Sequence, residues 1–154
     1  MHFPIYELTS ERLDRADWMD EFTFVDDPLV QCFTDYTQEI EEEDRENYLS
    51  RLPELFAGLA EVDLEKGEVR FESREKIEQV LNSYYRGIVD EMENTKSVGW
   101  LRFYQIRRYG YWYLDSEVIF YVNGCTLSSM QFVEDCYHYA GQTLYIGGVI
   151  DAHV

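Results

Sequence analysis

Residues 60–92 read AEVDLEKGEVRFESREKIEQVLNSYYRGIVDEM, and this stretch indicates the fold class. Its first part predicts a β-hairpin, because apolar residues alternate with polar ones on both sides of a turn at 65–67. From Ser73, which can cap a helix, the apolar spacing changes to three and four residues. The helical stripe consists of Ile77, Val80, Leu81, Tyr84, Tyr85, Ile88, Val89 and Met92. The stretch therefore predicts a hairpin followed by a long amphipathic helix that packs on a sheet.

The residues before this hairpin predict mostly helix. A short strand over 3–8 comes first, and Pro4 within it favours a position at the sheet edge. Helices are expected over 11–20 and over about 28–51, the second with or without a break.

The residues after the long helix predict strands. Aromatic and β-branched residues dominate three segments, 100–108, 111–114 and 117–123, and turn residues separate them. A short helix is expected over 130–137 and a final strand over 143–150. Helices first and antiparallel strands later indicate an α+β fold, with a mainly antiparallel sheet formed largely by the C-terminal third.

Length and composition favour one domain. The chain has 154 residues, of which 45% are hydrophobic, so it can bury a sizeable core. We expect a single compact domain over 1–154, with an acidic helical portion over about 1–59 and a sheet-rich portion over about 60–154.

The charge is large, negative and unevenly distributed. The formal net charge is −18, and residues 1–65 hold 19 acids against 4 bases. Direct nucleic-acid binding is disfavoured, because it needs clustered Lys and Arg, and anionic membranes are disfavoured for the same reason. No apolar run approaches a membrane span of about 20 residues. Residues 1–7 lack the basic and apolar segments of a secretory signal, so a cytoplasmic protein is expected.

The common catalytic motifs are missing from the sequence. It has no Walker-type phosphate loop, no dinucleotide fingerprint, no His-Glu-x-x-His, no Cys-x-x-Cys and no Gly-x-Ser-x-Gly. We therefore expect no enzyme activity, no cofactor and no metal site. One enzyme alternative remains, in which Cys136 is a nucleophile, His138 its base and Asp151 the orienting group. The other two histidines, His2 and His153, lie near the chain ends.

An acidic run is the strongest functional signal. Six of the eight residues over 39–46 are carboxylates. In a helix, Glu39, Glu42, Glu43 and Glu46 would share one face, where like charges at this spacing destabilise the helix. The candidate partner-binding residues are Asp14, Asp17, Asp20, Glu21, Asp26, Asp27, Asp35, Glu39, Glu41, Glu42, Glu43, Asp44 and Glu46.

Segregated negative charge favours fast, salt-sensitive encounter with a basic partner. The working hypothesis is a non-enzymatic acidic inhibitor that occupies the nucleic-acid groove of a nuclease or of a CRISPR or restriction effector. Anti-restriction, anti-CRISPR and nuclease-immunity proteins act by this physical logic, and the parallel rests on charge and size alone. The competing interpretation is that the acidic run is an ordinary solvated surface.

The aromatic segment near residue 110 suggests a second interface. Tyr109, Tyr111, Trp112 and Tyr113 are residue types that concentrate at binding hot spots. They predict an adaptor surface or a homodimer contact. Alternatively, they are cross-strand pairs that hold a sheet together.

Overall fold

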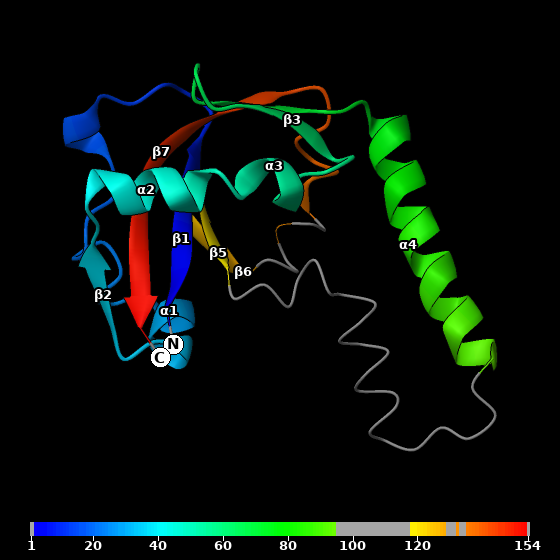
Figure 1. Cartoon of the computed structure of the whole chain (residues 1–154), viewed down its shortest axis with the longest axis horizontal. Coiled ribbons are helices and arrows are strands. Elements are labelled where there is room, and N and C mark those ends of the chain that lie inside the picture. The colour runs from blue at the N-terminus through cyan, green and yellow to red at the C-terminus, as the bar shows by residue number, and fades with distance from the viewer. Residues whose placement is uncertain (1, 95–117, 129–131, 133–134, 154) are drawn as a thin grey trace.

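The computed structural model describes residues 2–94, 118–128, 132 and 135–153 as a mixed α+β fold (Figure 1). The elements in chain order are β1 (His2–Thr9), the 3-10 turn η1 (Arg15–Asp17), α1 (Pro28–Phe33), β2 (Tyr36–Glu39), α2 (Glu42–Leu49), α3 (Leu52–Leu55), β3 (Ala60–Asp63), β4 (Glu68–Phe71), α4 (Arg74–Asn94), β5 (Ile119–Val122), β6 (Cys125–Ser128) and β7 (Thr143–His153). The α+β class expected from the sequence is therefore confirmed.

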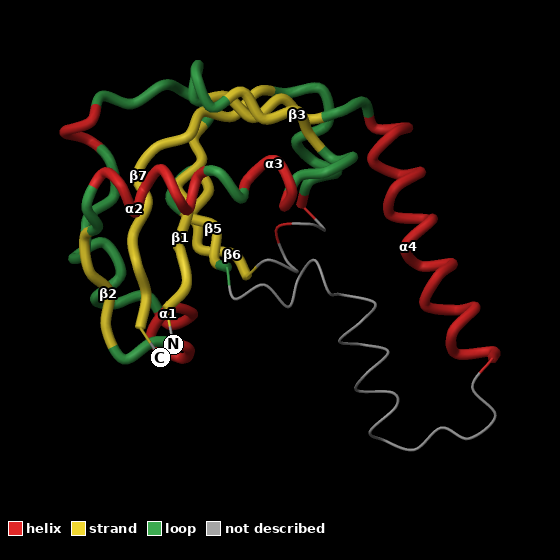
Figure 2. The backbone as a smooth tube through the Cα atoms, viewed as in Figure 1, coloured by secondary structure: helices red, strands yellow, loops and turns green. Residues whose placement is uncertain are grey.

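The strands form one sheet in the order β3-β4-β7-β1-β5-β6. Five of the six pairings among the described strands are antiparallel, and β1 with β5 is parallel. The long strand β7 has β1 along one side. Its other side is shared, because β4 pairs with 143–145 and β2 pairs with 150–153 (Figure 2).

Both faces of the central strands are buried. Along β1, Tyr6 and Leu8 belong to one hydrophobic cluster, whereas Phe3 and Ile5 belong to another. Successive residues of a strand point to opposite faces, so these clusters lie on the two sides of the sheet. The first cluster includes Leu52 and Phe56 of the α3 region, and the second includes residues from the segment before α1 and from α1 itself.

The expectation that the first strand lies at the sheet edge is wrong. β1 lies between β7 and β5, and residues 3–8 are all buried. A strand that is covered on both faces has a nearly continuous run of apolar residues. In residues 3–8 this run indicates a central position more strongly than Pro4 indicates an edge. Pro4 is tolerated where β1 has β7 as its only described neighbour, since pairing with β5 begins at Ile5.

The expected N-terminal helices form only in part, as the short helices α1 and α2. Within 11–20 the only helical turn is η1, and the segment over 28–51 is interrupted by β2. The reason in both places is tertiary contact that overrides local propensity. Met19 is buried and its backbone N–H bonds to Glu7 on β1, while β2 adds a strand to β7.

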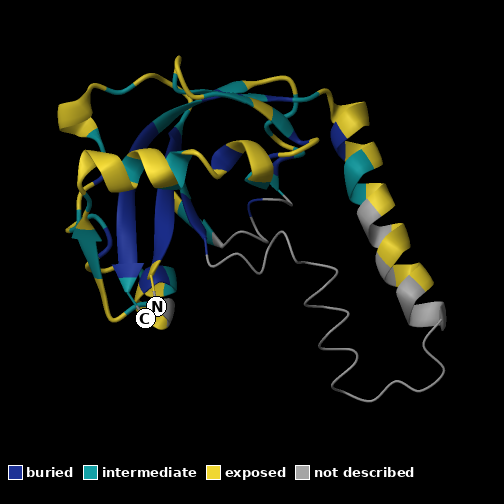
Figure 3. Cartoon of the chain, in the orientation of Figure 1, coloured by how far each residue is buried: buried dark blue, intermediate teal, exposed yellow. Residues whose placement is uncertain are grey.

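The hairpin forms where the sequence predicts it, as β3 and β4. The helix that follows, α4, contacts the body of the protein through its first turns. Ile77 is buried, and Val80 and Leu81 are partly buried against the core, whereas Val89 is half exposed. Figure 3 shows the burial along the chain. Among the described side chains of α4, those that pack on the core lie in its N-terminal part, and the stripe residues Tyr84, Tyr85, Ile88 and Met92 are outside the described side chains.

Within the residues that the structure describes, the sheet does not come largely from the C-terminal third, because β1 to β4 belong to the first half of the chain. The expected strand over 117–123 is present as β5, and the final strand is present and longer, as β7. The expected strands over 100–108 and 111–114 lie outside the described residues. The aromatic residues proposed as a second interface lie there too.

Candidate functional site

Residues 14–49 occupy one end of the molecule and carry the acidic residues singled out in the sequence (Figure 1). An ion pair of 2.5 Å between Arg15 and Glu42 joins η1 to α2. The hydroxyl of Thr37 on β2 donates to the carbonyl oxygen of Glu21 at 2.9 Å. We define the acidic edge as the exposed carboxylates of this end: Asp14, Asp17, Asp20, Asp26, Asp35, Glu39, Glu41, Glu42, Glu43, Asp44 and Glu46.

Two of the thirteen candidates, Glu21 and Asp27, are only partly exposed. Asp27 caps α1, because its carboxylate accepts hydrogen bonds from the N–H groups of Leu29 and Val30 at 2.9 Å each. The hydroxyl of Thr126 on β6 also donates to it. Asp27 therefore has a structural role.

The single helical face proposed for residues 39–46 is wrong in one respect. Glu39 ends β2, whereas Glu42, Glu43 and Glu46 lie on α2, a helix with no buried residue. The first turn of α2 holds Glu42, Glu43 and Asp44. Acids at this position are stabilised by the helix dipole, which offsets part of their mutual repulsion.

Two arginines lie among these acids, and both make specific contacts. Arg45 stacks over the Trp18 ring at 4.6 Å and donates to the carbonyl oxygen of Gly147 at 3.0 Å. Burial lowers the pKa of its guanidinium, and Glu42, 3.6 Å away, opposes that shift. Glu43, Asp44 and Glu46 have no ion-pair partner among the described residues. The α2 surface thus carries three carboxylates without a described ion pair.

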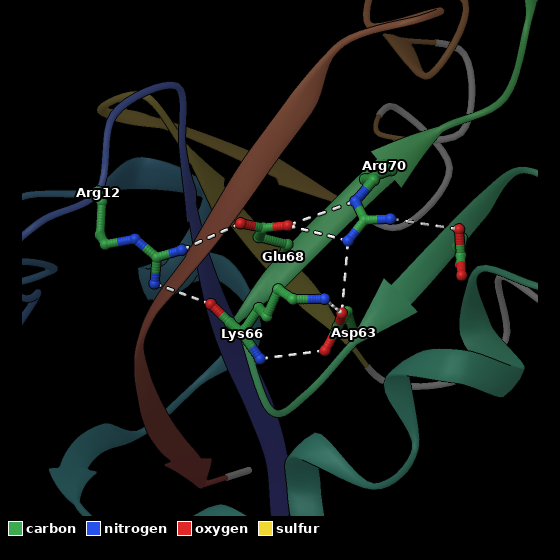
Figure 4. Close-up of polar contacts among 6 residues, drawn as sticks. Arg12, Asp63, Lys66, Glu68 and Arg70 are labelled. Carbon is green, nitrogen blue, oxygen red and sulfur yellow. Dashed lines mark hydrogen bonds and ion pairs between the residues drawn. The ribbon is translucent and has the colours of Figure 1, made fainter.

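The basic side chains at the hairpin end form ion pairs with acids of the hairpin itself (Figure 4). Arg12 bonds to Glu68 at 3.1 Å, Arg70 contacts Glu68 at 3.1 Å and Asp63 at 3.4 Å, and Lys66 contacts Asp63 at 2.6 Å. The bonds from Lys66 hold the pKa of the Asp63 carboxyl below its usual value. Asp63 and Glu68 of the hairpin are therefore paired with bases, whereas most carboxylates of the acidic edge have no ion-pair partner among the described residues.

The Cys136, His138 and Asp151 arrangement is not formed. Cys136 is fully buried, and this burial raises the pKa of its thiol to about 12, so the nucleophilic thiolate is absent near neutral pH. His138 is exposed, and the side-chain partners of Asp151 in the described structure are other residues.

Those partners make a cluster that the sequence interpretation missed. Asp151 Oδ2 lies 2.7 Å from His2 Nδ1 and 3.1 Å from His153 Nε2. Asp151 Oδ1 accepts a hydrogen bond of 2.9 Å from the hydroxyl of Tyr48. Burial is the main cause that raises the pKa of Tyr48 to about 12, and its bond to Asp151 adds to the shift. The tyrosine therefore remains a donor at neutral pH.

Comparison with protein-family models, curated proteins and solved structures finds no match. Within the described part of the chain, no helix has the length and apolar character that a bilayer crossing requires. Functional inference therefore rests on the acidic edge and on the His2–Asp151–His153 cluster.

Proposed function

We propose that this chain is a non-enzymatic binding protein whose acidic edge docks on the basic nucleic-acid groove of a partner enzyme and blocks it. The observation that carries the proposal is the concentration of eleven exposed carboxylates at one end of the molecule. The nearby arginines, Arg15 and Arg45, are engaged in their own contacts. The partner class is a nuclease or a CRISPR or restriction effector.

The form of α2 supports this docking. The helix lies on the surface without a buried residue, so its carboxylates are accessible. Side chains three and four residues apart on a helix are about 5–6 Å apart, close to the phosphate spacing of a nucleic-acid strand. Uncompensated charge steers association with an oppositely charged groove, and ionic strength weakens that steering.

The test compares two triple variants with equal charge change. Glu43→Gln, Asp44→Asn and Glu46→Gln neutralise α2 at residues without a described ion pair. The matched control, Glu65→Gln, Glu75→Gln and Glu78→Gln, neutralises three exposed acids away from the acidic edge. Tagged wild type and both variants are used to capture proteins from the native host lysate, with elution by moderate salt and identification by mass spectrometry.

We expect wild type and control to retain a basic nucleic-acid-handling enzyme that moderate salt releases. We expect the α2 variant to lose most of this capture, and purified wild type to inhibit the captured enzyme. Equal capture by both triple variants contradicts the proposal. Salt-resistant partners that are lost on Trp112→Ala would instead assign binding to the aromatic segment.

A further inference from the structure

Strand register places several polar side chains on one face of the sheet. On β7, His153 is opposite His2 of β1 and Tyr36 of β2. Two residues earlier, Asp151 is opposite Gln38 of β2. Residues two apart on a strand share a face, so these side chains project to the same side. The alignment depends on three strands and does not involve the acidic edge.

Two imidazole nitrogens lie close to one carboxylate oxygen in this cluster. Nδ1 of His2, Nε2 of His153 and a carboxylate oxygen of Asp151 all lie within 4.8 Å of one another. The Asp151 side chain is only 5% exposed. Nε2 of His153 is buried and makes no hydrogen bond, although Asp151 Oδ2 is 3.1 Å away. A buried imidazole nitrogen that makes no hydrogen bond points to a ligand that the nitrogen would bind.

The surrounding residues fix these groups in place. The Tyr36 ring stacks on His153 with centroids 4.1 Å apart and an interplanar angle of 16°. The Tyr48 hydroxyl donates to Asp151 Oδ1, whereas Oδ2 faces the two histidines and accepts a hydrogen bond of 3.4 Å from the Gln38 amide. Partners of this kind orient metal-binding side chains in known sites. The His2 side chain is 58% exposed, so the cluster is open to solvent at this residue.

We propose that His2, Asp151 and His153 bind a divalent transition metal ion of the zinc class. Two imidazole nitrogens and one carboxylate oxygen suit Zn²⁺, whereas Ca²⁺ and Mg²⁺ prefer oxygen ligands. Tetrahedral Zn²⁺ with bonds near 2.1 Å separates its ligand atoms by about 3.4 Å. The exposed His2 ring can move outward to reach that separation, and three protein ligands leave the fourth position for water.

The experiment is calorimetric titration of the full chain with ZnCl2 after treatment with a chelator. Excess Mg²⁺ in the buffer competes with Zn²⁺ for exposed carboxylates, because Mg²⁺ prefers oxygen ligands. The variants are His2→Ala and His153→Ala, and the matched control is His138→Ala, which removes the remaining histidine from an exposed position. Circular dichroism compares the fold of each variant with wild type.

We expect one Zn²⁺ per chain for wild type and for His138→Ala. We expect at least a tenfold loss of Zn²⁺ affinity for His2→Ala and for His153→Ala. When Co²⁺ is added in place of Zn²⁺, the wild type should show the visible absorption bands of tetrahedral Co²⁺, and both variants should lack them. If His153→Ala fails to fold, the exposed His2→Ala decides the result. Absence of stoichiometric Zn²⁺ binding in excess Mg²⁺, unchanged affinity in His2→Ala, or equal losses in His138→Ala would overturn the proposal.

Discussion

At the scale of single residues, the buried acid Glu7 explains why β7 has glycine at position 147. The carboxylate is buried, and its Oε2 accepts hydrogen bonds from the N–H groups of Met19 at 3.1 Å and Gly148 at 2.7 Å. A Cβ added at Gly147 would lie 2.2 Å from that oxygen. Gly147 therefore makes room for the buried acid, and Gly148 makes room for Met19, because a Cβ at 148 would lie 3.0 Å from the Met19 Cγ and 3.1 Å from its carbonyl oxygen.

Gly147→Ala is therefore expected to destabilise the fold. The new methyl group must displace Glu7 from its two hydrogen bonds, and overpacking of this kind costs about 2–3 kcal/mol. The measurement is the free energy of unfolding from urea denaturation. Gly87→Ala on α4 is the control, because a Cβ there meets no atom within 4 Å, and it should gain about 0.5–1 kcal/mol. Equal stability of both variants would contradict the role of Gly147.

At the scale of elements, α1 shows how a short helix is held in place. It has six residues, too few for an isolated helix to be stable. Its N-terminus is capped by Asp27, whose carboxylate also accepts from Thr126 on β6, and its Val30 side chain is buried in the core. The cap thus links α1 to the sheet.

Asp27→Ala should cost about 1–2 kcal/mol of unfolding free energy, because two N–H groups of α1 and the hydroxyl of Thr126 lose their acceptor. The neighbouring Asp26→Ala removes the same charge from an exposed side chain and should change stability by less than about 0.5 kcal/mol. Chemical denaturation followed by tryptophan fluorescence measures both. Similar losses in the two variants would assign the effect to charge rather than to capping.

Local and non-local information explain which elements the sequence predicted. The β3–β4 hairpin carries its own alternation and turn, so 60–71 was read correctly. β2 is a strand because it pairs with β7, about 115 residues later, and no local signal reveals that partner. The acidic edge, like the hairpin, follows from local information, because charged residues are expected at the surface. The His2–Asp151 contact joins residues 149 positions apart and requires the β1–β7 register.

At the scale of the whole molecule, uneven charge sets the response to salt. The net charge is −18, and most acids of the acidic edge have no ion-pair partner among the described residues, whereas Asp63 and Glu68 of the hairpin are paired. Repulsion between exposed charges is screened within a Debye length of about 10 Å at 0.1 M salt. Folding is therefore expected to be more favourable at moderate ionic strength than at low ionic strength.

Raising NaCl from low to moderate concentration should raise Tm by roughly 2–4 °C, the shift that corresponds to about 1 kcal/mol at this chain length. Differential scanning calorimetry in the presence of a chelator measures this shift without metal binding. The Glu43→Gln, Asp44→Asn, Glu46→Gln variant should respond less than wild type, because part of the repulsion is removed. A Tm that falls over the same range would contradict the repulsion argument.

The pairing of His2 with His153 has a mechanical consequence. These residues lie side by side at one end of two antiparallel strands, so a force that pulls them apart acts across the β1–β7 ladder. Its hydrogen bonds are perpendicular to the strands and would break one after another, as in unzipping, rather than all together. Resistance to such a pull begins at His2 and His153, where a bound metal ion would join the two strands.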